Sequence, residues 1–153
     1  DDLELFEFLS SNGYALGTDF IVGHPGETKE IWQEAMKNLH NFPLTHIHAF
    51  TYSKRDGTPS ASMKDIVKGD IAKDRYIELV EIIKQKNYEF RQNIKKNKVK
   101  LEVLVEQEKN GKYLGFDQFF NQVEISSNED LVSDWLNLED YKVEFNKNEA
   151  RFK

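Results

Sequence analysis

The stretch Thr18–Thr28, with the sequence TDFIVGHPGET, decides the fold of the first half of the chain. Its first residues form a short apolar run with a β-branched bias, which predicts a buried strand. Gly23 and Gly26 permit backbone angles that are closed to other residues, and the proline between them fixes one dihedral, so a tight turn should follow. Thr28 can cap the next helix. In parallel α/β folds, ligands bind at such a corner, although it can also be a plain strand–helix connection.

The patterns that flank this stretch predict a helix–strand–helix–strand order. A first helix includes Leu3 and Phe6 and stops at Asn12-Gly13. Apolar residues at helical spacing predict a second helix over 28–40, and alternating β-forming residues predict a second strand over 45–52. Two strands joined by a helix form a βαβ unit with a parallel pair. This part of the chain is therefore predicted to be an α/β fold.

The remaining sequence predicts a loop over 53–67, a long helix over 70–94 and then a change of character near 96–99. Val99–Glu106 is a clear strand, and Asn110-Gly111 is a turn signal. Further short strands are predicted over 113–116, 119–125 and 141–145. Several short strands in sequence are typical of a small antiparallel β-barrel of the OB type. We therefore predict two domains, 1–97 and 98–153.

The composition excludes several kinds of site. The 153 residues carry a net charge of −6 and contain no cysteine, which excludes disulfides, thiolate zinc sites and thiolate-held iron–sulfur clusters within them. No apolar run is long enough for a membrane helix and no basic signal region opens the chain, so we expect a cytoplasmic protein without a membrane partner. A helix is predicted to begin at once, with no Met before Asp1. We therefore expect the chain to be a piece of a longer protein.

Basic residues are concentrated between Lys84 and Lys100, where Glu89 is the single acid. Together with Tyr88 and Phe90, this segment is typical of a nucleic-acid surface, or else of a solvated helix face. Residues 99–153 carry 7 basic and 12 acidic side chains, which argues against strong nonspecific RNA binding by this part alone. Two adjacent cations in the 53–67 loop could contact phosphate. The predicted RNA-binding residues are Lys54, Arg55, Lys84, Arg91, Lys95 and Lys96.

Two other sets of residues have both a functional and a structural interpretation. His46 and His48 point to the same face of the second predicted strand, but no third ligand is evident, so no metal site is predicted. The aromatic residues of the predicted barrel either offer flat faces to bases or fill the interior. They are Tyr113, Phe116, Phe119 and Phe120.

Three stretches in chain order carry a resemblance to a known family. They are Asp19–Thr28 (DFIVGHPGET), His48–Pro59 (HAFTYSKRDGTP) and Leu101–Glu106 (LEVLVE). Together they resemble the C-terminal part of a radical-SAM methylthiotransferase of the MiaB/MtaB type. That family's pattern is roughly DxIVGFPGET, then YSxRxGTPA, then a LEVLVE-like strand. Here His24 stands where the pattern has Phe, and the family's CxxxCxxC motif is absent from these residues.

The resemblance implies a fold and cofactors. Residues 1–97 would be the C-terminal portion of a partial radical-SAM (α/β) barrel, and residues 98–153 a TRAM β-barrel that helps to hold RNA. The full-length enzymes use S-adenosylmethionine and two 4Fe-4S clusters. Because the cluster cysteines would lie outside these residues, we expect no catalytic residue in this fragment, no bound cofactor and no activity from the fragment alone. The residues expected to bind S-adenosylmethionine are Asp19, Ile21, Gly23, Phe50 and Tyr52.

The resemblance also implies a substrate. The family methylthiolates an adenosine next to the tRNA anticodon, and Lys54 and Arg55 favour tRNA as the partner, with threonylcarbamoyl-adenosine as the nucleoside. A related enzyme that modifies a ribosomal protein tends to be acidic in that loop, and it is the first alternative. The second alternative is an RNA-binding module without catalysis.

Overall fold

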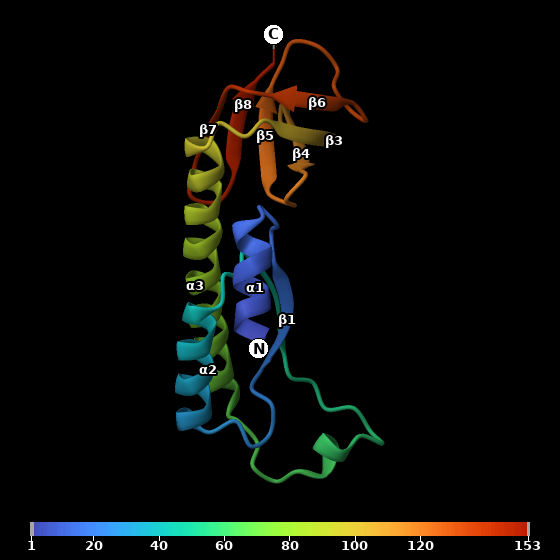
Figure 1. Cartoon of the computed structure of the whole chain (residues 1–153). Coiled ribbons are helices and arrows are strands. Elements are labelled where there is room, and N and C mark those ends of the chain that lie inside the picture. Colours follow the sequence, from blue (N-terminus) through green and yellow to red (C-terminus); the bar gives the residue numbers. More distant parts are fainter. Residues whose placement is uncertain (1, 153) are drawn as a thin grey trace. The chain divides into compact units, whose positions relative to one another are not determined.

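The computed structural model describes residues 2–152. The chain forms two compact units, Asp1–Lys86 and Asn87–Lys153 (Figure 1). Helix α3 (Gly69–Lys96) contributes to both, because the division falls inside it. The sequence pattern places a boundary at the end of this helix, whereas the structure assigns its last turns, from Asn87 onward, to the second unit.

The first unit contains a parallel strand pair with helices beside it. β1 and β2 pair from Gly17 opposite His46 to Val22 opposite Thr51, so the predicted βαβ unit is confirmed. The elements before α3 are α1 (Asp2–Ser11), β1 (Gly17–Val22), α2 (Lys29–Asn41), β2 (His46–Thr51) and the 3-10 helix η1 (Pro59–Ser62).

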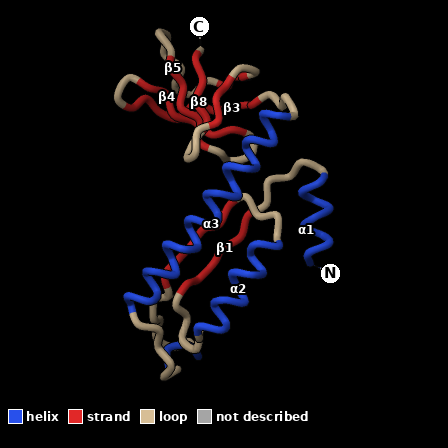
Figure 2. Tube along the Cα trace, turned by 90° about the vertical axis from the view of Figure 1, so that its left-hand side faces the viewer, coloured by secondary structure: helices blue, strands red, loops and turns tan. Residues whose placement is uncertain are grey.

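The strand pair buries one face and leaves the other open. Phe20 and Val22 of β1 pack into a core with α2 and α3, which run beside the strand in Figure 2. Asp19 and Ile21 point to the opposite side, because side chains alternate along a strand. The buried members of this core are Val22, Trp32, Met36, Leu39, Leu44, Leu79 and Ile83.

Helix α2 forms for local reasons that the sequence shows. Thr28 caps it, and the Thr28 hydroxyl accepts a hydrogen bond from the Ile31 N–H at 3.3 Å. Trp32, Met36 and Leu39 recur at helical spacing and are all buried. The Trp32 indole N–H also donates to the Glu78 carboxylate at 2.7 Å, which ties α2 to α3.

The second unit is one six-stranded sheet with the order β6-β3-β4-β5-β8-β7. The sheet is curled (Figure 2). The predicted purely antiparallel barrel is wrong in one respect. The sheet is mixed, because β5 and β8 pair in parallel, whereas all other neighbouring strands of the sheet pair antiparallel. The strands are β3 (Leu101–Lys109), β4 (Lys112–Asp117), β5 (Gln122–Ser126), β6 (Trp135–Leu138), β7 (Tyr141–Val143) and β8 (Asn148–Arg151).

A tight turn separates β4 from β5 and delays the start of the predicted strand over 119–125. The Asp117 carboxylate accepts hydrogen bonds from the backbone N–H groups of Phe119 and Asn121, at 2.9 and 2.8 Å. Phe120 therefore adopts a positive φ of 61° and is 80% exposed. Strand β5 begins only after this turn.

The core of the second unit is closed by the end of α3. Ile94 is buried among the strand residues, and Phe90 packs edge-on against Phe119 with 5.6 Å between ring centroids. The buried strand and loop residues are Leu101, Val103, Val105, Val123, Ile125, Leu131, Leu136, Leu138 and Tyr141. Across residues 2–152, the structure contains no helix that is both long and apolar enough to cross a membrane.

Candidate functional site

The corner after β1 is closed by Glu27. Its carboxylate accepts the Gly23 N–H at 3.2 Å and an Arg75 guanidinium N–H at 2.6 Å. The side chains of Glu27 and Arg75 are nearly buried, at 10% exposure each, so the Glu27 carboxylate holds the turn and is not presented to a ligand. Gly23 has a φ of +80°, and a Cβ there would lie 2.9 Å from the Ala72 Cβ. The corner thus needs glycine both for its backbone angle and for the approach of α3.

An open hollow of about 610 Å³ lies at the carboxyl ends of β1 and β2. Ile21 and Phe50 are opposite each other in the strand pair, and both side chains are 53% exposed. Two large apolar side chains side by side on an open face offer a wall for a flat apolar ligand, and the volume suits a small molecule. The other lining residues are His24, Thr51, Tyr52, Ser53, Arg55, Thr58 and Ser60.

Tyr52, which lines the hollow, has a side-chain hydroxyl that lacks a hydrogen-bond partner. Its hydroxyl is buried and has no hydrogen-bond partner within residues 2–152. The ring meets His24 edge-on, with 5.2 Å between centroids, and the backbone N–H continues the parallel ladder by donating to Val22 O at 2.8 Å. A buried hydroxyl without a partner is unfavourable, so a ligand whose binding turns this hydroxyl toward the hollow and pairs with it gains affinity.

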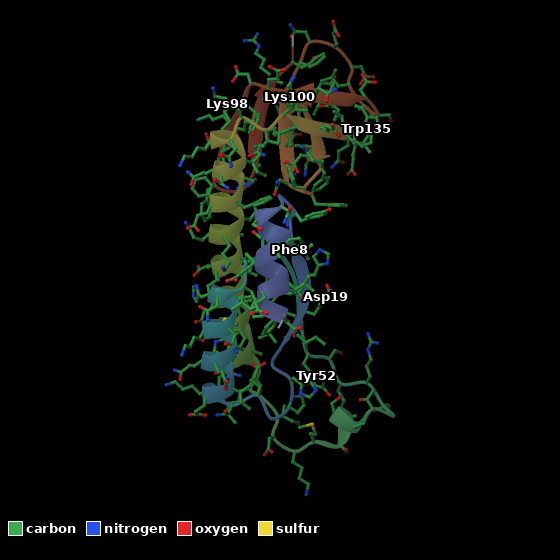
Figure 3. All side chains as sticks on the ribbon, in the orientation of Figure 1. Phe8, Asp19, Tyr52, Lys98, Lys100 and Trp135 are labelled. Carbon is green, nitrogen blue, oxygen red and sulfur yellow. The ribbon has the colours of Figure 1, made fainter. Side chains whose placement is uncertain are left out.

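The structure brings only some of the predicted cofactor residues together. Ile21, Phe50 and Tyr52 line the same hollow, and Gly23 forms the backbone corner beside it. Asp19 (Figure 3) lies on the same strand face, but it lines a smaller hollow of about 270 Å³ with His46 and His48. Its carboxylate is 3.4 Å from the His48 Nδ1, and both side chains are more than three-quarters exposed.

The two histidines share one strand face, as their spacing predicts. His46 Nδ1 lies 2.8 Å from the Thr45 hydroxyl, and His48 faces Asp19. No set of three or more His, Cys, Asp and Glu side chains in the described part of the chain is grouped so as to hold a metal ion.

Arg91, one of the predicted RNA-binding residues, is buried inside the second unit. Its side chain is 1% exposed, and its guanidinium donates to the backbone carbonyls of Glu144, Phe145 and Lys147 at 2.6–2.9 Å. It also donates to the side chains of Asn148 and Asn87. Burial lowers the pKa of Arg91, and the nearby Asp117 partly opposes that shift. Arg91 is therefore a structural cation inside the second unit and has no face for RNA.

The other predicted cations lie at the surface. Lys54 and Arg55 are exposed in the loop after β2, and Arg55 lines the larger hollow. Lys84 and Lys96 are exposed on α3. Lys95 is partly covered, with its ammonium 4.3 Å from the centre of the Tyr141 ring and 3.8 Å from Asp140.

The sequence is similar to several methylthiotransferases. It is 44% identical over 151 residues to a Helicobacter pylori (strain J99) protein assigned as a methylthiotransferase, a match that covers 99% of this chain and 36% of that protein. It is 28% identical over 143 residues to the threonylcarbamoyladenosine tRNA methylthiotransferase MtaB of Bacillus subtilis. This match covers 92% of this chain and 32% of that protein.

The name of a third relative gives a different substrate. The ribosomal protein uS12 methylthiotransferase RimO of Caldanaerobacter subterraneus is 39% identical over 103 residues, covering 67% of this chain and 23% of that protein. The chain therefore spans about a third or less of the length of these relatives. No family model matches it. The resemblance carried by the three motifs is confirmed: over nearly its whole length, the chain is homologous to part of the methylthiotransferases.

Proposed function

We propose that the whole protein to which this chain belongs methylthiolates an adenosine next to the tRNA anticodon, with threonylcarbamoyl-adenosine as the nucleoside. Similarity to MtaB over 92% of the chain supports tRNA as the substrate. The exposed cations Lys54 and Arg55 in the loop after β2 suit a polyanionic partner. A tRNA substrate implies a cytoplasmic enzyme, as the sequence predicts.

The observation that carries the proposal is the hollow beside Ile21, Phe50 and Tyr52. Its apolar wall and its buried, unpaired tyrosine hydroxyl fit the adenine half of S-adenosylmethionine, which is flat and carries polar edges. Ile21 and Phe50 would cover one side of the ring, and Tyr52 would pair with a polar edge once its buried hydroxyl turns toward the hollow. When bound, S-adenosylmethionine supplies the radical chemistry of the family. Ile21, Phe50 and Tyr52 would bind and orient its adenine half.

The iron–sulfur clusters of the family find no ligands in this chain. It contains no cysteine, and thiolates are the usual ligands of such clusters. We therefore propose that residues 1–153 alone are inactive and bind S-adenosylmethionine weakly. Calorimetry that detects micromolar binding of S-adenosylmethionine to the isolated fragment would contradict this.

The second candidate function is methylthiolation of a ribosomal protein. The RimO relative supports it, because its identity of 39% exceeds the 28% of MtaB, although over a shorter match. The test is an assay of the full-length enzyme on both substrates, read by mass spectrometry of tRNA nucleosides and of the ribosomal protein. We expect a methylthio group on the tRNA nucleoside. Modification of the protein alone would overturn our choice.

A further inference from the structure

Three polar side chains form a row on the outer face of the second unit. Ser126 ends β5 opposite Arg151 of β8, and Tyr113 of β4 pairs with Ile125 of β5. One residue along from the Tyr113–Ile125 pair, Lys112 stands opposite Ser126. The Lys112 ammonium donates a hydrogen bond to the Ser126 hydroxyl at 2.6 Å. Directly opposed residues share a face of a sheet, so Lys112, Ser126 and Arg151 lie side by side across three strands.

Within residues 2–152, the two cations of this row form no ion pair with the carboxylates near them. The acids of the neighbouring row, Glu124 and Glu149, are both held by Lys147, at 2.6 and 3.4 Å. Within residues 2–152, neither Lys112 nor Arg151 has an acidic side chain within ion-pairing distance. Two exposed, unneutralised cations flanking a hydroxyl are a good match for a phosphate group, which accepts several hydrogen bonds and carries negative charge.

The row separates two hollows of the second unit. One of about 460 Å³ extends from the row toward Lys95 and Tyr141 and is also lined by Lys142 and by the acids Glu124, Asp140 and Glu149. The other, of about 400 Å³, extends toward Gly111 and Phe152 and has no acidic residue in its lining. Lys112, Ser126 and Arg151 line both. A free phosphate would use only the row. A polynucleotide that passes over the row has a hollow on each side for the neighbouring sugar and base, so the geometry favours a chain of nucleotides.

We propose that Lys112, Ser126 and Arg151 bind a backbone phosphate of the RNA substrate. This inference rests on the proposed tRNA-modifying function and extends it to residues that the sequence pattern missed. The basic run over 84–100 does not include them, and they stand far apart in a part of the chain that is net acidic. The role of the site is to position the RNA, because phosphate contacts fix register without reading sequence.

The test measures binding of the full-length enzyme to unmodified tRNA as a function of salt. Each phosphate contact contributes about 0.7–0.9 to the slope of log K against log salt concentration. We expect K112Q and R151Q each to reduce the magnitude of the slope by part of that amount, and the double variant, which leaves this phosphate without a cation, to reduce it by about the whole amount. K112R should retain the slope. Lys98→Gln is the matched control, because it removes one exposed charge of the same unit outside both hollows.

The outcomes distinguish failure of the phosphate site from failure of the proposed function. An unchanged slope in K112Q and R151Q, or an equal loss in K98Q, overturns the phosphate site while leaving the proposed function intact if the variants still methylthiolate tRNA. Calorimetric titration with inorganic phosphate and AMP distinguishes a free anion as the source. Tight binding of either, lost in the variants without a change in the tRNA slope, also overturns the proposal. If the wild-type enzyme neither binds nor modifies tRNA, the proposed function itself fails.

Discussion

Tyr52 is the residue whose surroundings bear most directly on ligand binding. Its hydroxyl is buried without a partner, while its ring packs against His24. The unpaired hydroxyl lowers the stability of the free protein, but it raises the affinity for a ligand that forms a hydrogen bond with it. These two effects can be measured separately.

Replacing Tyr52 with Phe should weaken binding of S-adenosylmethionine to the full-length enzyme by about three- to tenfold, the equivalent of one hydrogen bond. The free energy of unfolding should stay the same or rise by up to about 1 kcal/mol, because the variant removes an unpaired buried group. Calorimetry and chemical denaturation give the two quantities. Tyr14→Phe, at a tyrosine that is 60% exposed, should change neither. Unchanged affinity in Y52F would remove the hydroxyl from the site.

Replacing Arg91 with Met should destabilise the second unit by about 3 kcal/mol, because several buried oxygens lose their donor at once. Lys96→Met, at an exposed position of the same helix, should change stability by less than about 0.5 kcal/mol. Thermal unfolding compares them. If R91M unfolds like K96M, the carbonyl contacts contribute little and Arg91 returns to the list of surface cations.

The misassigned role of Arg91 shows where sequence reasoning ends at this scale. A run of cations on a long helix does not say which of them is buried. The available signal was Asn87, a polar residue where the apolar spacing of α3 breaks. Asn87 and Arg91 are four residues apart, and the Arg91 Nε donates to the Asn87 side chain at 2.8 Å. This polar residue in the apolar face of α3 marks the partner of the buried Arg91 guanidinium.

At the scale of elements, the βαβ unit was predictable because its signals are local. The apolar run of β1, the glycine turn, the Thr28 cap and the spacing of α2 each specify their own segment. β6 and β8 were missed for the opposite reason. WLNL is too short to show a period, and NEAR is polar, so these strands exist through pairing with distant segments. The parallel pairing of β5 with β8 is likewise a long-range effect.

The turn that ends β1 should require glycine at position 23. Gly23→Ala should destabilise the first unit by about 2–3 kcal/mol, because it combines a left-handed backbone angle with a clash against Ala72. Gly13→Ala has a similar φ of +86° but open space around it, so it should cost only about 1 kcal/mol. Adding Ala72→Gly to G23A should recover part of the difference. Denaturant titrations decide, and equal losses in G23A and G13A would exclude the clash.

At the scale of the whole molecule, the second unit includes the last turns of α3. A fragment of residues 87–153 should unfold cooperatively, whereas one of residues 98–153, which starts at the boundary predicted from the sequence, should not. The shorter fragment lacks Phe90, Arg91 and Ile94, and the lost contacts amount to about 5 kcal/mol or more, comparable to the total stability of a small domain. Circular dichroism during heating separates the two. A cooperative transition in the shorter fragment would show that the helix end is dispensable.

The position of β8 has a consequence for how the protein is made. It comes last among the six strands along the chain, yet it lies inside the sheet, between β5 and β7. While the ribosome is still synthesising the residues before Asn148, the edge of β5 has no neighbour and β7 has nothing to pair with. Since a chain emerges from its N-terminus onward, this unit can close only after Arg151 has left the exit tunnel. Until then, the nascent chain carries an open sheet edge along residues 123–126, a form that chaperones bind and that a premature stop codon before β8 would make permanent.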